Sequence, residues 1–231
     1  MIKGYTLEIC TGCLEDVITA SSFPETDRIE LNCALSEGGL TPSLATLRMA
    51  REITQIPILC MVRPRGAGFH YTAKEKELMR KDAELFLSEG ADGIVFGSLQ
   101  ENRIDEAFTE QMVQLIHSYG KTAVFHKAFD ETEDFSEAME TLIGLGCDRI
   151  LTSGGQPDCF AGRKIIRELI EKAAGRIEIL PGGGITEQNI RQILQASGTR
   201  QFHMSAKALR KDISPYYAVD ALTIQCILDT F

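Results

Sequence analysis

The sequence lacks any apolar stretch long enough to cross a lipid bilayer. Nowhere in its 231 residues do about 18 apolar residues follow one another. The first ten residues, MIKGYTLEIC, also lack the long apolar centre of a secretory signal. We therefore expect a cytoplasmic protein with no membrane partner.

Positive charge is scarce as well. The chain has 24 Lys and Arg against 33 Asp and Glu, a formal net charge of -9. Because nucleic-acid binding depends on clustered basic residues that neutralise phosphates, we expect no nucleic-acid partner. Linkers and low-complexity segments are also missing, and the 44% hydrophobic content allows a large core. These features predict a single domain over residues 1–231.

The seven cysteines do not form the pattern of a disulfide framework, because their number is odd and they are scattered. Cys10 and Cys13 form a C-x-x-C pair at the end of a predicted strand, and Cys33 lies just past the next one. Neighbouring strands would bring these three sulfurs together as a soft site suited to Cu(I). The alternative is that they are ordinary buried thiols.

Short apolar runs that end on polar or glycine clusters recur eight times, each followed by a helix-like segment. This alternation predicts an α/β fold with parallel strands, and eight units at this length predict a (β/α)8 TIM barrel. Helix signals agree, since Thr72 opens a capping box with Glu75, and Gly198 follows a helix-like stretch. The eight runs cover residues 7–10, 28–32, 56–65, 93–97, 122–130, 149–155, 177–184 and 202–206.

Several of these runs carry titratable residues between apolar neighbours. Strand side chains alternate between the barrel interior and the helix layer, so Glu8 and Glu30 are expected inside. A lone buried carboxylate costs several kcal/mol, so each needs a partner, and Arg63 and Arg65 are the expected partners. The same alternation predicts that Lys127 faces the helices, which makes it a weaker candidate for forming a Schiff base.

Acidic, basic and imidazole side chains thus gather at the carboxyl ends of the strands, where barrel enzymes have their active sites. Such groups can exchange protons with a substrate and hold an anion. The alternative is an internal lattice of ion pairs that only fills the barrel. The candidate catalytic residues are Glu8, Glu30, Arg63, His126, Asp130 and His203.

The sixth and seventh runs end in glycine-rich turns. Glycines expose backbone amides, and amides at a helix N-terminus bind anions, often phosphate after the seventh strand of a barrel. The alternative is a pair of tight turns without a ligand. The candidate anion-binding residues are Arg65, Ser153, Gly154, Gly182, Gly183 and Gly184.

Eight stretches of the sequence resemble the CutC family, which is named for copper homeostasis. The resemblance implies a cytoplasmic β/α barrel that handles copper, with Cu(I) near cysteines at the ends of the first two strands. Cys10 matches the first of these cysteines, whereas RIELC in the family is RIELN here, which puts Asn32 in place of the second. The stretches are RIEL (28–31), SEGGLTP (36–42), RPRG (63–66), DGIVFG (92–97), FHKAFD (125–130), LTSG (151–154), PGGGIT (181–186) and FHMSA (202–206).

Two functions remain open from the sequence. One is a copper homeostasis protein that binds Cu(I) through Cys10, Cys13 and Cys33. The other is an enzyme that acts on a small anionic or phosphorylated metabolite by acid–base chemistry. The expected partner is accordingly a copper ion or a small anion, and the oligomeric state is open, a homo-oligomer included.

Overall fold

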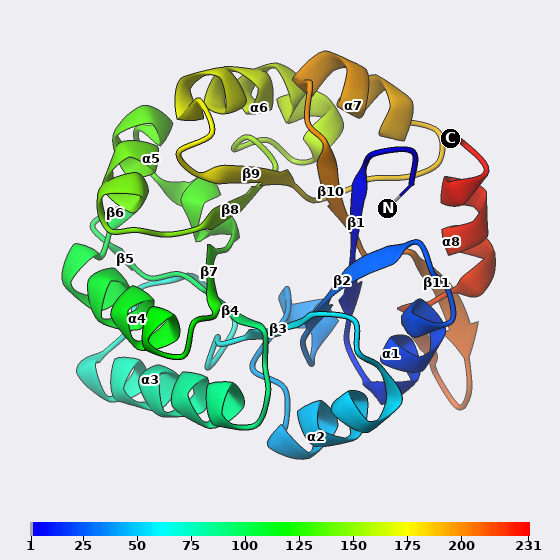
Figure 1. Cartoon of the computed structure of the whole chain (residues 1–231), viewed down its shortest axis with the longest axis horizontal. Helices are drawn as coiled ribbons and strands as arrows, with labels where there is room; N and C mark the ends of the chain where they lie inside the picture. Colours follow the sequence, from blue (N-terminus) through cyan, green and yellow to red (C-terminus); the bar gives the residue numbers. More distant parts are fainter. Residues whose placement is uncertain (1) are drawn as a thin grey trace.

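Eight parallel strands form a nearly closed barrel with helices around it (Figure 1), as the sequence predicts. The structure is a computed structural model that describes residues 2–231. The barrel strands are β1 (Thr6–Thr11), β2 (Thr26–Leu31), β3 (Ile58–Met61), β4 (Gly93–Phe96), β7 (Thr122–Phe125), β8 (Arg149–Thr152), β9 (Glu178–Pro181) and β10 (Gln201–Met204).

The order of strands brings the two ends of the chain together. The sheet runs β10-β1-β2-β3-β4-β7-β8-β9, so the last barrel strand pairs with the first. A parallel bridge between Gly182 and His203 links the end of β9 to β10 across the remaining gap. Residues nearly 200 positions apart therefore become neighbours inside the barrel.

Helices cover the outside of the barrel, and all of α1 to α8 except α1 and α7 begin at a side-chain cap. Thr72 and Glu75 form the predicted capping box of α3, and Gly198 ends α7 with a φ of 74°, a left-handed conformation that glycine adopts without strain. None of the helices within residues 2–231 has the length and apolarity needed to span a bilayer. The helices are α1 (Leu14–Ser21), α2 (Leu44–Ile53), α3 (Ala73–Ser88), α4 (Glu106–Ser118), α5 (Phe135–Gly144), α6 (Cys159–Ala173), α7 (Ile190–Ser197) and α8 (Ala221–Leu228).

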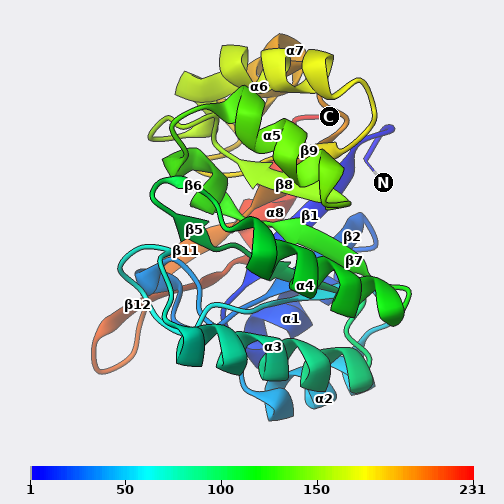
Figure 2. The ribbon, with the colours of Figure 1, turned by 90° about the vertical axis from the view of Figure 1, so that its left-hand side faces the viewer.

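Some strands are shorter than the apolar runs that predict them. β3 ends at Met61 and β7 at Phe125, and the residues after β7 form a 3-10 helix, η2 (Lys127–Glu131). Two antiparallel hairpins add to the barrel: β5 (Leu99–Gln100) with β6 (Arg103–Ile104), and β11 (Lys207–Lys211) with β12 (Pro215–Val219). Figure 2 shows the second hairpin projecting from the end of the barrel that lies opposite the two termini. The barrel strands finish at this same end.

The interior of the barrel is divided into an apolar and a polar part. The apolar part comes from β3, β4, β7, β8 and β9 and forms a buried cluster of its own. Towards β1, β2 and β10 the inward positions carry Glu8, Glu30 and His203, all of them buried. The apolar cluster consists of Leu59, Met61, Val95, Val124, Leu151 and Leu180.

Candidate functional site

Glu8 lies at the centre of the polar part and contacts three basic side chains. The register of β1 against its two neighbours pairs Glu8 with His203 on one side and Arg28 on the other. Its carboxylate lies 2.8 Å from His203 Nδ1, 2.9 Å from Arg28 Nε and 4.0 Å from Arg149 Nη1. Burial alone would raise the pKa of Glu8, but His203, Arg28 and Arg149 outweigh it and lower this pKa to about 2.

Glu8 positions His203 through one ring nitrogen, and the other ring nitrogen lies on the side of Glu30. Because Glu8 is ionised, Nδ1–H of His203 donates to it. Burial disfavours the charged ring, yet Glu30 and Glu8 overcome that effect and raise the pKa of His203. The second nitrogen, Nε2, lies 3.9 Å from Glu30 Oε2.

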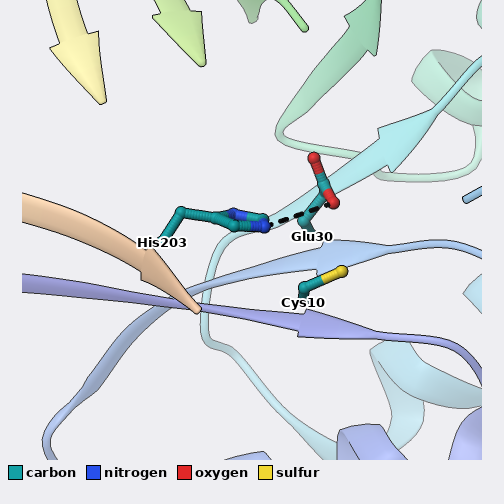
Figure 3. Close-up of side chains that lie close together, drawn as sticks. All are labelled: Cys10, Glu30 and His203. Carbon is teal, nitrogen blue, oxygen red and sulfur yellow. Dashed lines mark ion pairs between the residues drawn. The ribbon is translucent and has the colours of Figure 1, made fainter. Parts of the chain in front are cut away.

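Cys10, Glu30 and His203 form a compact group of side chains from β1, β2 and β10 (Figure 3). One donor atom from each lies within 4.8 Å of the others, as the ligands of one metal ion must. Asn32 supports the group, since its Nδ2 donates to Glu30 Oε2 at 2.8 Å and lies 3.5 Å from Cys10 Sγ. Burial and then the charge of Glu30 raise the pKa of the Cys10 thiol well above its ordinary value, so this thiol keeps its proton.

The other two cysteines predicted as metal ligands do not join this group. Among the described residues, Cys10, Glu30 and His203 are the only such cluster, so Cys10, Cys13 and Cys33 do not meet at one point. Cys13 is exposed at the position that precedes α1. Cys33 is half-buried, and its thiol donates to the carbonyl of Thr41 at 3.1 Å.

Arg63 and Arg65 are not the partners of the buried carboxylates, contrary to the expectation from the sequence. Arg63 is buried, but its guanidinium donates to the carbonyls of Glu37 and Gly39. Arg65 turns outward, pairs with Glu75 and donates to carbonyls of its own loop. The role of Arg65 seen here is therefore to hold the loop after β3 against the start of α3.

Asp130 and the turn after β8 satisfy each other. The Asp130 carboxylate accepts hydrogen bonds from the Ser153 amide at 3.0 Å, the Ser153 hydroxyl at 2.9 Å and the Gly155 amide at 3.0 Å, and also from the Thr152 hydroxyl. The Gly154 amide donates to the Thr152 side chain. The amides proposed as anion donors at this turn are thus already bonded within the protein.

The turn after β9 differs from that after β8. The Gly182 amide donates to the carbonyl of Thr152, but the amides of Gly183 and Gly184 form no hydrogen bond within residues 2–231. A cavity of 530 Å³ is lined by these two glycines together with Cys10 and His203. The anion-binding role of this turn stays a prediction, and the cavity that Gly183 and Gly184 line is the one that Cys10 and His203 also line.

Lys127 does not face the helix layer as strand alternation predicts. Its Nζ lies 3.9 Å from Asp130 Oδ2 and 3.5 Å from where a Cβ on Gly183 would be, so the amine reaches the end of β9. Alternation fails because β7 ends at Phe125, and the chain has entered η2 at Lys127.

Sequence reasoning missed two cations that shape the site, and it named Asn32 without predicting its contacts. Arg28 and Arg149 are the cations that pair with Glu8, and Asn32 joins Cys10 to Glu30. A signal for Arg28 was present, because it lies two residues before Glu30 on the same strand and so shares its inward face. Arg149 opens β8 in the same way, two residues before the inward Leu151.

The pKa of Glu8 predicts how stability changes in acid. A carboxylate whose pKa falls from 4.5 to about 2 on folding stabilises the native state above pH 4.5, and that contribution disappears as the pH falls toward 2. Urea unfolding at several pH values should therefore show the stability gap between wild type and Glu8→Gln narrowing over this window. A gap that stays constant from pH 6 down to about pH 3 would contradict this assignment.

The fold and this group of side chains define a (β/α)8 barrel protein with a candidate metal-binding cluster near the carboxyl ends of its strands. A family model described as the CutC family matches residues 5–208. The chain belongs to the CutC family.

Individual proteins agree with this family assignment. A CutC family protein of Treponema denticola is 44% identical over 92% of this chain and 86% of its own length. The human copper homeostasis protein cutC homolog is 42% identical over 90% of this chain and 76% of its own. The crystal structure of a CutC protein from Streptococcus agalactiae superposes with a TM-score of 0.80 at 32% identity, covering 87% of this chain and 98% of that one.

Proposed function

We propose that this protein acts in copper homeostasis in the cytoplasm by binding Cu(I) through Cys10 and His203, with Glu30 as a third ligand. The observation that carries the proposal is the grouping of sulfur, imidazole nitrogen and carboxylate oxygen within 4.8 Å. Thiolate and imidazole are donors that suit Cu(I), whereas a carboxylate is a harder ligand. The human relative's name, copper homeostasis protein cutC homolog, supports the choice of metal.

The surroundings of His203 fit this role. Ligating histidines usually donate their second ring N–H to a carboxylate, which fixes the ring and its tautomer. Glu8 stands in that position at 2.8 Å from Nδ1, and leaves Nε2 directed at Glu30. The arrangement therefore presents Nε2 to an ion without any change in the backbone.

Binding of Cu(I) must displace protons from its ligands. The protonated forms of Cys10 and His203 are both favoured: burial and the charge of Glu30 raise the pKa of the thiol, and Glu30 and Glu8 raise the pKa of the imidazole against the opposite effect of burial. A cation bound to Sγ and Nε2 has to replace both protons, since these atoms donate only in their deprotonated forms. Asn32 assists here, because its Nδ2–H beside Sγ stabilises negative charge on the sulfur.

The test compares three serine variants for Cu(I) affinity, measured by competition with a chelator under anaerobic, reducing conditions. Cys10→Ser should weaken binding by roughly 100-fold, because serine replaces the soft ligand by a hard one. Cys13→Ser and Cys33→Ser are the controls and should bind as wild type does, since neither sulfur belongs to the group. Equal losses in all three variants, or none in Cys10→Ser, would refute the proposal.

A further inference from the structure

Arg63 is a buried cation without a counterion. Arg63 is 7% exposed, and its guanidinium donates to two backbone carbonyls, Glu37 O at 2.8 Å and Gly39 O at 3.2 Å. No carboxylate of residues 2–231 lies within 4.0 Å of it. Its Nε is buried and has no hydrogen-bond partner. Because a buried charge is costly unless it is paired, this position calls for an anion.

His126 supplies a second buried donor without an acceptor. The Ala128 amide donates to its Nδ1 at 3.1 Å, so that nitrogen carries no proton. Burial and then the charge of Arg63 lower the pKa of His126 to about 3, which leaves the ring neutral with its proton on Nε2. The residue is 3% exposed, and Nε2 has no partner in the described chain.

The two donors share one aromatic neighbour. The Phe69 ring centroid lies 4.9 Å from Arg63 Cζ and 4.8 Å from the centre of the His126 ring. β4 runs between β3 and β7, and Gly97 just after it carries no side chain, which leaves room for the imidazole of His126. A Cβ on Gly97 would lie 2.5 Å from His126 Nδ1, which shows how closely the ring fits there.

We propose that Arg63 and His126 bind the anionic oxygen group of a small metabolite, a carboxylate or a phosphate, at a site separate from the copper ligands. The anion supplies the missing counterion of Arg63 and accepts the Nε2–H of His126. A neutral imidazole that donates from Nε2 can also polarise a carbonyl next to such a group. The pair therefore gives the barrel a metabolite site that does not depend on metal.

Phe69 must move to admit such a ligand, because the unpartnered Arg63 and His126 atoms are inaccessible beneath it. It belongs to the loop of residues 66–71, which contains Gly68 at a φ of +88°. Arg65 holds this loop through the carbonyls of Gly66 and His70. The loop thus covers the donor pair and is anchored at its base.

The experiment is a calorimetric titration of the metal-free protein, kept with a copper chelator at constant ionic strength, with malonate and with inorganic phosphate as separate probes. At least one probe should bind saturably, and the one that binds identifies the oxyanion class. Arg63→Gln and His126→Phe should each weaken that binding by roughly tenfold or more. A loss of this size is expected when one hydrogen bond to a charged group is removed. Arg103→Gln, which removes an exposed arginine paired with Glu137, is the control and should bind as wild type does.

A second measurement uses only the wild-type protein, so that it does not depend on the variants folding. The ¹⁵N resonance of His126 Nε2 should shift on adding the probe that binds, while that of the exposed His117 stays in place. No saturable binding of either probe, binding that both variants retain, or an unmoved His126 resonance would each overturn the proposal. Since copper is absent throughout, these results are independent of the metal-binding tests.

Discussion

Replacing Glu8 with glutamine should lower the free energy of unfolding by about 3–5 kcal/mol at neutral pH, the usual cost of breaking a buried ion pair. Glu8 is 2% exposed and is the shared partner of His203, Arg28 and Arg149. Glutamine keeps the shape of the side chain but removes its charge. His203 and Arg28 then lose their nearest counterion, and the buried Arg149 keeps only the exposed Glu178. The loss therefore far exceeds that of a surface pair.

Glu178→Gln is the matched control for this measurement. Glu178 also binds Arg149, at 2.6 Å, but its side chain is 54% exposed, so water replaces the lost interaction. Urea unfolding followed by circular dichroism should show a loss below about 1 kcal/mol for this variant. Similar losses for both variants would mean that the Glu8 network contributes no more than a surface ion pair.

The barrel could be predicted from the sequence because its signals are local. A β-branched run, a polar or glycine cluster and a helix cap each depend on a few neighbouring residues. Each of the eight runs contains or overlaps one barrel strand. The two hairpins were missed because β5 and β6 have two residues each, and β11 reads KALRK, without a buried face.

The composition of the site was predicted better than its contacts. Alternation placed Glu8 and Glu30 inside, and His203 was named as a catalytic candidate, but which of the three touch is decided by strand register and barrel closure. His203 meets Glu8 only because β10 pairs with β1, and no local pattern encodes that register. The same limit explains why Arg63 was chosen as a partner for the carboxylates in place of Arg28.

The three cysteines of the prediction do not form one group, for a related reason. Sequence spacing predicted that Cys13 and Cys33 lie close to Cys10. In the structure Cys13 directly precedes α1, and the Cys33 thiol donates to the carbonyl of Thr41. Asn32 holds the place beside Cys10 instead. This position therefore decides how many sulfurs the site can offer to a copper ion.

Asn32→Cys should raise the affinity for Cu(I) by roughly 100-fold, because a second thiolate adds a soft ligand next to Cys10. Asn32 is 1% exposed and its side chain extends to Cys10, with Nδ2 at 3.5 Å from Sγ, so a cysteine here directs its sulfur toward the first one. The substitution restores the RIELC form that the family resemblance describes. Affinity is measured by chelator competition with a phosphine reductant, since two adjacent thiols can oxidise to a disulfide.

Asn32→Ser separates the effect of the new sulfur from the loss of the amide. Serine has nearly the size of cysteine, and both variants lose the Nδ2 hydrogen bond to Glu30. If soft-ligand chemistry governs the site, only Asn32→Cys binds Cu(I) more tightly, and Asn32→Ser binds more weakly than wild type because Cys10 loses its donor. Equal affinities in the two variants would show that the sulfur at position 32 never reaches the metal, and that Cu(I) is bound away from the Cys10 group.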